Sequence, residues 1–185
     1  KYADADCAAG VTACREIGYG VTQPTIARLS DGTWAAVFGN GYNSHSHKAQ
    51  LFVVNLATGK LVELIDSGVG NANNPNGLAA AFVTDWPNND LSAARAYAGD
   101  LQGNLWRFSL RETRGATKLF TATDGKTAQP ITARPVLQGL PGAWDRAVVA
   151  VGSGSYFRKE DEDMESPQTQ SLYGVFDTAE GVSGV

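Results

Sequence analysis

The chain has 185 residues, a net charge of −4 and a charged fraction of only 18%. It contains 21 glycines against one methionine, and this composition is typical of turn-rich β structure rather than of a helical bundle. Lys and Arg are dispersed, which leaves no basic stripe for nucleic acid or anionic lipid, and no apolar run approaches the roughly 18 residues that span a bilayer. We therefore expect one β domain with no nucleic-acid partner and no membrane insertion.

The first segment, residues 1–20, carries the two cysteines, Cys7 and Cys14. A local disulfide is the main prediction, since no histidine or third cysteine stands at ligand spacing. Two free thiols and a zinc half-site stay open as alternatives, although two ligands cannot close a tetrahedral site. A disulfide implies an oxidising compartment. Because the chain starts at Lys1 without a signal sequence and stops at Val185 just after a strand-like segment, we expect a larger exported parent.

Three copies of one unit follow this segment. The hexapeptide Gln23–Arg28 returns as Gln129–Arg134, and Asn76–Ala80 stands midway between them. A period of about 50 residues implies three units. The predicted units cover residues 21–70, 76–123 and 129–178 of a single domain, 1–185.

Each unit repeats one strand pattern. A hydrophobic segment ends at Gly39, Gly99 and Gly152, a glycine-bearing loop follows, and an aromatic-bearing strand comes next. The predicted third strands cover 50–56, 104–110 and 171–177, and fourth strands cover 60–66 and 118–121. Four strands in about 50 residues predict an all-β fold of four-stranded antiparallel β-propeller blades. A three-sheet sandwich fragment is the alternative, although sandwich strands do not ordinarily repeat their opening hexapeptide.

Residue size indicates how such blades would pack. Small residues in the first two strands of each unit let backbones crowd near a central channel. Trp106 and Phe108 are large enough to fill the wedge between neighbouring blades. Three blades do not close a ring, because propellers have about four to eight. We expect either a partial propeller or further blades in the parent.

The stretch Tyr97–Leu110 resembles the PilC/PilY family of type IV pilus biogenesis and tip-adhesin proteins. Phe38–Asn43, Ala49–Gly59 and Val151–Phe157 are similar to adjacent blades of that family, so the likeness covers most of 23–177. The resemblance implies a non-enzymatic, seven-bladed C-terminal propeller, exported to the cell surface, the pilus tip or the outer membrane of a Gram-negative type of cell. It implies roles in pilus assembly, in extension and retraction and in adhesion, with minor pilins and a host-surface receptor as partners.

The resemblance also implies a calcium loop just before Tyr97, in which calcium occupancy affects pilus extension and retraction. The family loop spaces acidic or amide side chains two apart and closes with an Asp about three residues before the Tyr. Here Asn88 and Asp90 fit, Asp85 is displaced by one residue, and Ala94 stands at the closing position. Calcium takes six to eight oxygens, so losing a carboxylate weakens the site. Two interpretations stay open: a degenerate calcium site and a polar turn whose side chains cap the backbone.

Two further polar segments are weaker candidates. His45 and His47 alternate along one segment and could chelate a metal, or they lie in a solvated loop, since no carboxylate or cysteine is near in sequence. The charged run Lys159–Glu165 predicts an extended, hydrated loop, with a partner or cation site as the alternative. Both follow the second strand of their units, so we expect them on one rim, our candidate contact surface. The turns Gly39–Gly41 and Gly152–Gly154 are not phosphate loops, because strands follow them.

Two other functions compete with a pilus propeller. A pyrroloquinoline-quinone dehydrogenase propeller is the enzymatic rival, since Gly99–Trp106 also resembles the blade repeat of quinoproteins. That motif occurs once, and no vicinal cysteine pair is present. A periplasmic scaffold of the outer-membrane assembly type shares the repeat but seldom needs long charged rim loops. Neither histidine has a nucleophile or carboxylate at catalytic spacing, so we predict no catalytic residues and no enzyme activity.

Overall fold

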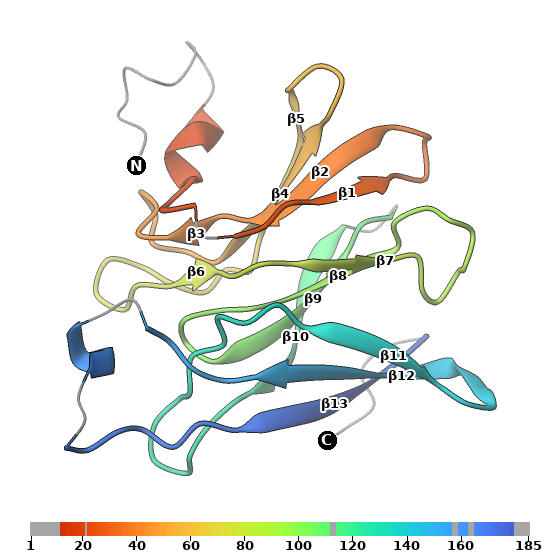
Figure 1. Ribbon diagram of the computed structural model, residues 1–185. Coiled ribbons are helices and arrows are strands. Elements are labelled where there is room, and N and C mark those ends of the chain that lie inside the picture. The colour runs from red at the N-terminus through yellow and green to blue at the C-terminus, as the bar shows by residue number, and fades with distance from the viewer. Residues whose placement is uncertain (1–11, 21, 112–113, 157–158, 163–164, 180–185) are drawn as a thin grey trace.

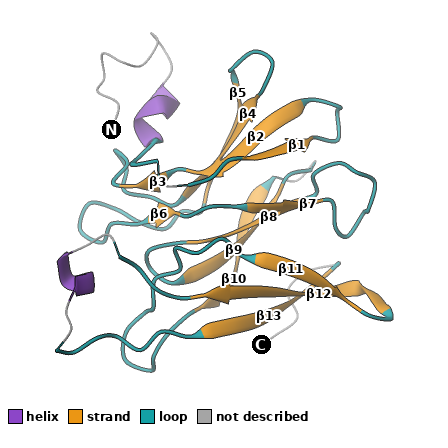
Figure 2. Ribbon diagram, in the orientation of Figure 1, coloured by secondary structure: helices purple, strands orange, loops and turns teal. Residues whose placement is uncertain are grey.

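The computed structural model describes residues 12–20, 22–111, 114–156, 159–162 and 165–179. Its main strands form three antiparallel sheets that follow one another in chain order, with the connections gathered at two opposite rims (Figure 1). The helical elements of the described residues are two short 3-10 helices, η2 (Thr12–Glu16) and η3 (Lys159–Glu162) (Figure 2). Among these residues no helix has the length and apolarity needed to cross a membrane.

The first sheet has the strand order β1-β2-β4-β5. Its strands are β1 (Thr25–Arg28), β2 (Trp34–Gly39), β4 (Gln50–Asn55) and β5 (Leu61–Asp66). Consecutive antiparallel strands need tight turns, and the turn after β4 shows how the sequence provides one. Asn55 Oδ1 accepts the backbone N–H groups of Ala57 and Thr58 at 2.9 and 3.0 Å, and Gly59 adopts a φ of 68° that a side chain would oppose.

The second sheet, in the order β10-β9-β8-β7, repeats this arrangement, and the third has three strands in the described residues, β11-β12-β13. The strands of the second sheet are β7 (Phe82–Thr84), β8 (Arg95–Gly99), β9 (Asn104–Ser109) and β10 (Gly115–Thr121). Those of the third are β11 (Val136–Leu140), β12 (Ala143–Gly152) and β13 (Leu172–Thr178). A two-stranded ladder of β3 (Gly41–Tyr42) and β6 (Gly77–Leu78) joins the first unit to the second.

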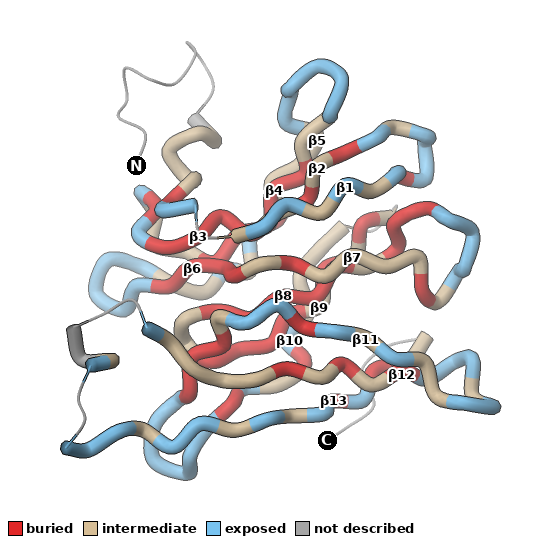
Figure 3. Tube along the Cα trace, viewed as in Figure 1, coloured by how far each residue is buried: buried red, intermediate tan, exposed pale blue. Residues whose placement is uncertain are grey.

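Two hydrophobic cores lie between the sheets, one on each side of the second sheet (Figure 3). Strand β9 contributes to both, because alternate side chains point to opposite faces. Trp106 and Phe108, 4% and 0% exposed, pack in the core shared with the first sheet. Leu105 packs with Val149 and Val175 of the third sheet. The prediction that Trp106 and Phe108 fill the space between adjacent sheets is confirmed.

The glycine that ends the second strand of a unit lets the chain entering the next unit pass against it. A Cβ on Gly39 would lie 2.0 Å from the carbonyl oxygen of Ala79, and one on Gly99 would lie 2.0 Å from Cγ2 of Ile131. At Gly152 an added Cβ would meet no heavy atom within 4 Å. Gly39 and Gly99 are therefore required by close approach of the following unit.

The repeated hexapeptides do not occupy equivalent positions, contrary to the sequence-based expectation. Thr25–Arg28 is strand β1 itself, whereas Ile131–Arg134 lie ahead of β11. Ile131 instead forms a bridge to Gly154 and donates its N–H to the carbonyl oxygen of Asp100 at 2.9 Å. The two hexapeptides therefore do not align the first unit with the third, because the chain crosses the second unit at Ile131 before it enters the third sheet.

Candidate functional site

The connection between β7 and β8, hereafter the 85–92 loop, contains the three residues predicted to bind calcium. The backbone carbonyl of Asp85 accepts the N–H groups of Asn88 and Asn89 at 2.9 and 3.0 Å, and its Oδ2 accepts the N–H of Leu91 at 3.1 Å. Asn89 and Leu91 adopt φ values of 53° and 62°, a left-handed conformation that costs energy for residues with a side chain. Asp85 thus caps a compact turn.

The carboxylate of Asp90 is bound by donors of the protein. Its Oδ1 accepts the backbone N–H of Ser92 at 3.0 Å and the Ser92 hydroxyl at 2.7 Å. Nη2 of Arg111, just after β9, lies 2.7 Å from Oδ1 and 2.8 Å from Oδ2. The hydrogen bond from the Ser92 hydroxyl, followed by that from Arg111, holds the pKa of Asp90 well below its usual range.

The donor set of this loop does not fit the calcium site that the family resemblance implies. Both oxygens of Asp90 face a guanidinium, and Oδ2 of Asp85 already accepts a backbone N–H. At the closing position, Ala94 has no side-chain oxygen, and its backbone N–H and C=O bond Thr84 and Leu110 at 2.8 and 3.0 Å. Calcium needs six to eight oxygens with several negative charges, and this loop directs too few of them outward.

Contacts to both neighbouring units fix the 85–92 loop in place. On one side Ala93 donates its N–H to the carbonyl oxygen of Arg28 at 2.7 Å. On the other, Nε1 of the buried Trp86 donates to the carbonyl oxygen of Trp144 at 3.1 Å. The guanidinium carbon of Arg95 lies 4.7 Å from the centre of the Trp86 ring, a cation–π contact. The loop is therefore held between the first and third units.

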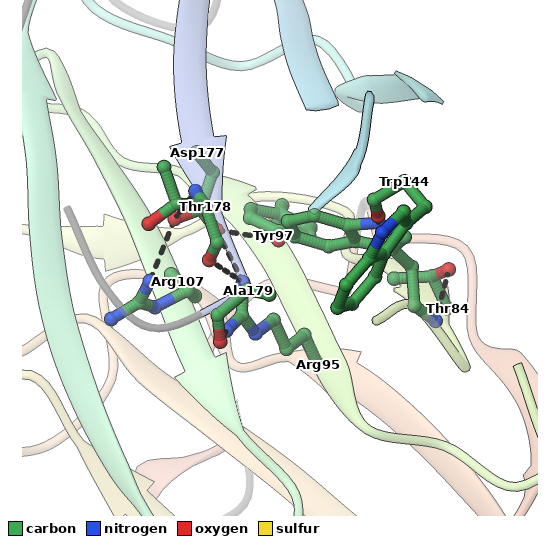
Figure 4. Close-up of polar contacts among 9 residues, drawn as sticks. Thr84, Arg95, Tyr97, Arg107, Trp144, Asp177, Thr178 and Ala179 are labelled. Atoms are coloured by element: carbon green, nitrogen blue, oxygen red, sulfur yellow. Dashed lines mark hydrogen bonds and ion pairs between the residues drawn. The ribbon is translucent and has the colours of Figure 1, made fainter. Parts of the chain in front are cut away.

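A buried carboxylate, Asp177 on β13, joins the third sheet to the second (Figure 4). Nη1 of Arg95 and Nη1 of Arg107 donate to its two oxygens at 2.9 and 2.7 Å, and the hydroxyl of Tyr97 donates at 2.7 Å. Arg95 also donates to the carbonyl oxygens of Thr178 and Ala179, both at 2.7 Å. Burial, followed by the charge of Asp177, raises the pKa of Tyr97. Sequence analysis missed this cluster, whose only signal was a lone Asp in an apolar strand.

A second buried carboxylate, Asp100, organises the motif that suggested the family. Its oxygens accept the backbone N–H of Asn104 at 2.8 Å, Nδ2 of Asn76 at 2.8 Å and Nε1 of Trp106 at 2.8 Å. Equivalent positions in the other units, Asn40 and Ser153, accept the N–H groups of Gln50 and Ser171 at 3.1 and 2.8 Å. Within the described residues this motif is a turn whose polar side chains are hydrogen-bonded inside the protein.

The connections from β2 to β4 and from β12 to β13 both emerge at the rim opposite the 85–92 loop (Figure 1). In the first, Ser46 donates to Glu16 and His45 donates its N–H to the carbonyl oxygen of Arg15 at 3.1 Å. Among the described residues no group of three His, Cys, Asp or Glu side chains is placed to hold a metal ion, so His45 and His47 gain no third ligand.

In the second connection, Lys159–Glu162 form the 3-10 helix η3 instead of the fully extended segment predicted. The Ser155 hydroxyl donates to Asp161 at 2.7 Å. At the N-terminal side, Cys14 lies in η2 and Cys7 lies outside the described residues, so their disulfide stays a prediction.

The model of the PilY1 beta-propeller domain matches residues 3–118. The type IV pilus biogenesis factor PilY1 of Pseudomonas aeruginosa is 37% identical over 193 residues, which cover 91% of this chain and 16% of that protein. A homologue of that factor from Xylella fastidiosa is 37% identical over 169 residues, covering 91% of this chain and 13% of that protein.

The crystal structure of the P. aeruginosa PilY1 C-terminal domain superposes with a TM-score of 0.82 at 33% identity, over 92% of this chain and 41% of that one. This likeness confirms the predicted propeller architecture over the sandwich alternative. Each sheet described above is accordingly a blade. The chain spans less than a fifth of the length of these curated relatives.

Proposed function

We propose, since this chain belongs to the PilY1 β-propeller domain family, that it acts as a rigid scaffold within a type IV pilus biogenesis factor. The observation that carries this proposal is the match of 92% of the chain to the PilY1 C-terminal domain at a TM-score of 0.82. The finer roles we infer are support of pilus assembly, control of extension and retraction, and adhesion at a cell surface. They place the protein outside the cytoplasm, at the pilus tip or outer membrane.

The internal structure supports a scaffold that presents loops. Asp177 ties blade three to blade two, and the Trp86–Trp144 contact ties the same two blades at the rim. Surface loops on such a rigid frame can vary without loss of the fold, and they commonly carry recognition. We infer that minor pilins, and a surface receptor in adhesion, contact the rim to which the described residues 40–49, 153–156, 159–162 and 165–171 contribute.

A chimera tests the pilus role. The matching segment of P. aeruginosa PilY1 would be replaced by this chain in a strain from which PilY1 has been removed, and surface pili, twitching motility and surface attachment would be measured separately. We expect pili to be restored. An Asp177→Ala chimera, which loosens the blade contact, is the matched control for loss of fold. A chimera that is exported in normal amount, yet restores no pili, would contradict the assembly role; pili without attachment would contradict only adhesion.

We further propose that the chain has no enzymatic activity of its own. Trp106, the residue shared with the quinoprotein motif, donates its Nε1–H to Asp100 inside the blade and packs in the core. Its role is accounted for by packing and hydrogen bonding. A dye-linked alcohol oxidation assay with added pyrroloquinoline quinone should show no turnover above a boiled control. Turnover that disappears in a Trp106→Phe variant of unchanged stability would revive the dehydrogenase alternative.

A further inference from the structure

Several oxygens of the 85–92 loop converge on one positive charge, and that charge belongs to the protein. Four loop oxygens surround Nη2 of Arg111: Asp90 Oδ1 and Oδ2 at 2.7 and 2.8 Å, and the carbonyl and hydroxyl oxygens of Ser92, both at 3.2 Å. All four come from two residues of one loop. A guanidinium donates in a fixed plane and stays charged, so one arginine can organise oxygens as a bound cation does.

The position of Arg111 is itself fixed by the blade. The preceding residue, Leu110, is 1% exposed and donates its N–H to the carbonyl oxygen of Ala94 at 3.0 Å. This bond joins the end of β9 to the base of the 85–92 loop. The register of the sheet therefore places Arg111 next to Asp90. Arg111 and Asp90 retain 25% and 45% side-chain exposure, so the pair lies at the surface.

Other charged groups near the loop are already engaged or lie apart from Asp90. Arg114, the residue before β10, pairs with Glu63 of the first blade at 2.8 Å. Asp85 accepts the Leu91 N–H, and among the described residues Asp90 forms its ion pair with Arg111 and not with Arg28. Among the described residues, Arg111 is therefore the cation that neutralises Asp90.

We propose that Arg111 takes the place of a calcium ion in this loop, so that the loop keeps its closed conformation without calcium and does not respond to calcium concentration. The proposal goes beyond the pilus role, because it concerns how this loop is held whatever the propeller binds. It also accounts for Ala94 at the closing position. Because the guanidinium of Arg111 already supplies the positive charge, the loop needs no further carboxylate to bind a cation.

Amide hydrogen exchange on this chain tests the proposal directly. Arg111→Ala should speed exchange of the Leu91 and Ser92 amides by about two- to fivefold, the range expected for loss of an exposed ion pair, while the melting temperature changes little. Arg111→Lys should restore slow exchange in part, because it returns the charge but not the planar donor. Arg114→Ala is the matched control: its pair is equally exposed, and it should leave both amides unchanged.

A calcium titration is the second test of the proposal. Wild-type chain titrated with calcium chloride from micromolar to millimolar concentration should give no saturable heat and no change in Leu91 or Ser92 exchange. Saturable micromolar binding that Asp90→Ala removes would overturn the proposal. So would unchanged exchange of both amides in Arg111→Ala. Because each readout is local and the pilus assay is not used, either result leaves the proposed function standing.

Discussion

Removing the carboxylate of Asp177 should cost more stability than removing any exposed charge of the chain. Asp177 is fully buried, while the side chains of Arg95 and Arg107 are only 12% and 14% exposed. Asp177→Ala leaves two nearly buried guanidinium groups without their carboxylate, and breaking a buried pair in this way costs about 3–5 kcal/mol. Arg95 keeps two carbonyl acceptors, so most of the loss falls on Arg107 and on the Tyr97 hydroxyl.

Equilibrium denaturation in urea, followed by tryptophan fluorescence, measures this loss as a lower midpoint at an unchanged slope. Asp177→Asn keeps the shape and one acceptor, so it should cost less, about 2 kcal/mol. Lys48→Ala is the exposed comparison: the Lys48–Asp66 pair is 2.8 Å long with side chains 38% and 37% exposed, and its loss should cost about 0–1 kcal/mol. If Asp177→Ala destabilised the chain no more than Lys48→Ala does, the cluster would not hold the blades together.

Four further variants test the packing and the turns. Gly39→Ala should destabilise by about 1–3 kcal/mol or prevent folding, because its Cβ would overlap backbone, whereas Gly152→Ala should be nearly neutral in the same melting assay. Trp106→Ala should cost about 3–5 kcal/mol in denaturant unfolding, and an unchanged curve would argue against its burial. Hydrogen bonds from the backbone N–H groups of Thr127 and Lys126 lower the pKa of Asp124 to about 2, below the value of about 3.9 in the unfolded chain. The stability that Asp124 adds over Asp124→Asn should therefore be present above about pH 4 and disappear as the pH falls through about 2, which acid titration of both unfolding curves would show.

The blade pattern could be predicted from the sequence because its signals are local. Glycines that end hydrophobic segments mark the second strand of each unit, and Gly39 and Gly99 indeed lie where the next unit crosses. The size of Trp106 and Phe108 likewise predicted that they fill the space between neighbouring blades. The hexapeptide register failed because residues of similar type form strand β1 at Thr25–Arg28 but a crossing segment ahead of β11 at Ile131–Arg134.

The charge clusters could not be predicted because their members meet across blades. Arg95 and Asp177 are far apart in sequence, and only the packing of β8 against the end of β13 brings them together. Arg111 and Asp90 belong to different connections of one blade, so the loop sequence alone leaves Asp90 looking like a free ligand. Sequence spacing identified the right loop and the absent carboxylate at Ala94, but not the guanidinium beside it.

The crossings at Gly39 and Gly99 make the fold directional. The first and second blades each contact the chain that enters the following blade, Gly39 against Leu78 and Ala79 and Gly99 against Ile131. A substitution at one of these contacts should therefore disturb the downstream blade before the upstream one. During synthesis, the blades can fold in order from the amino-terminal one onward. Destabilisation by substitution and folding during synthesis should therefore both proceed from the N-terminal to the C-terminal blade.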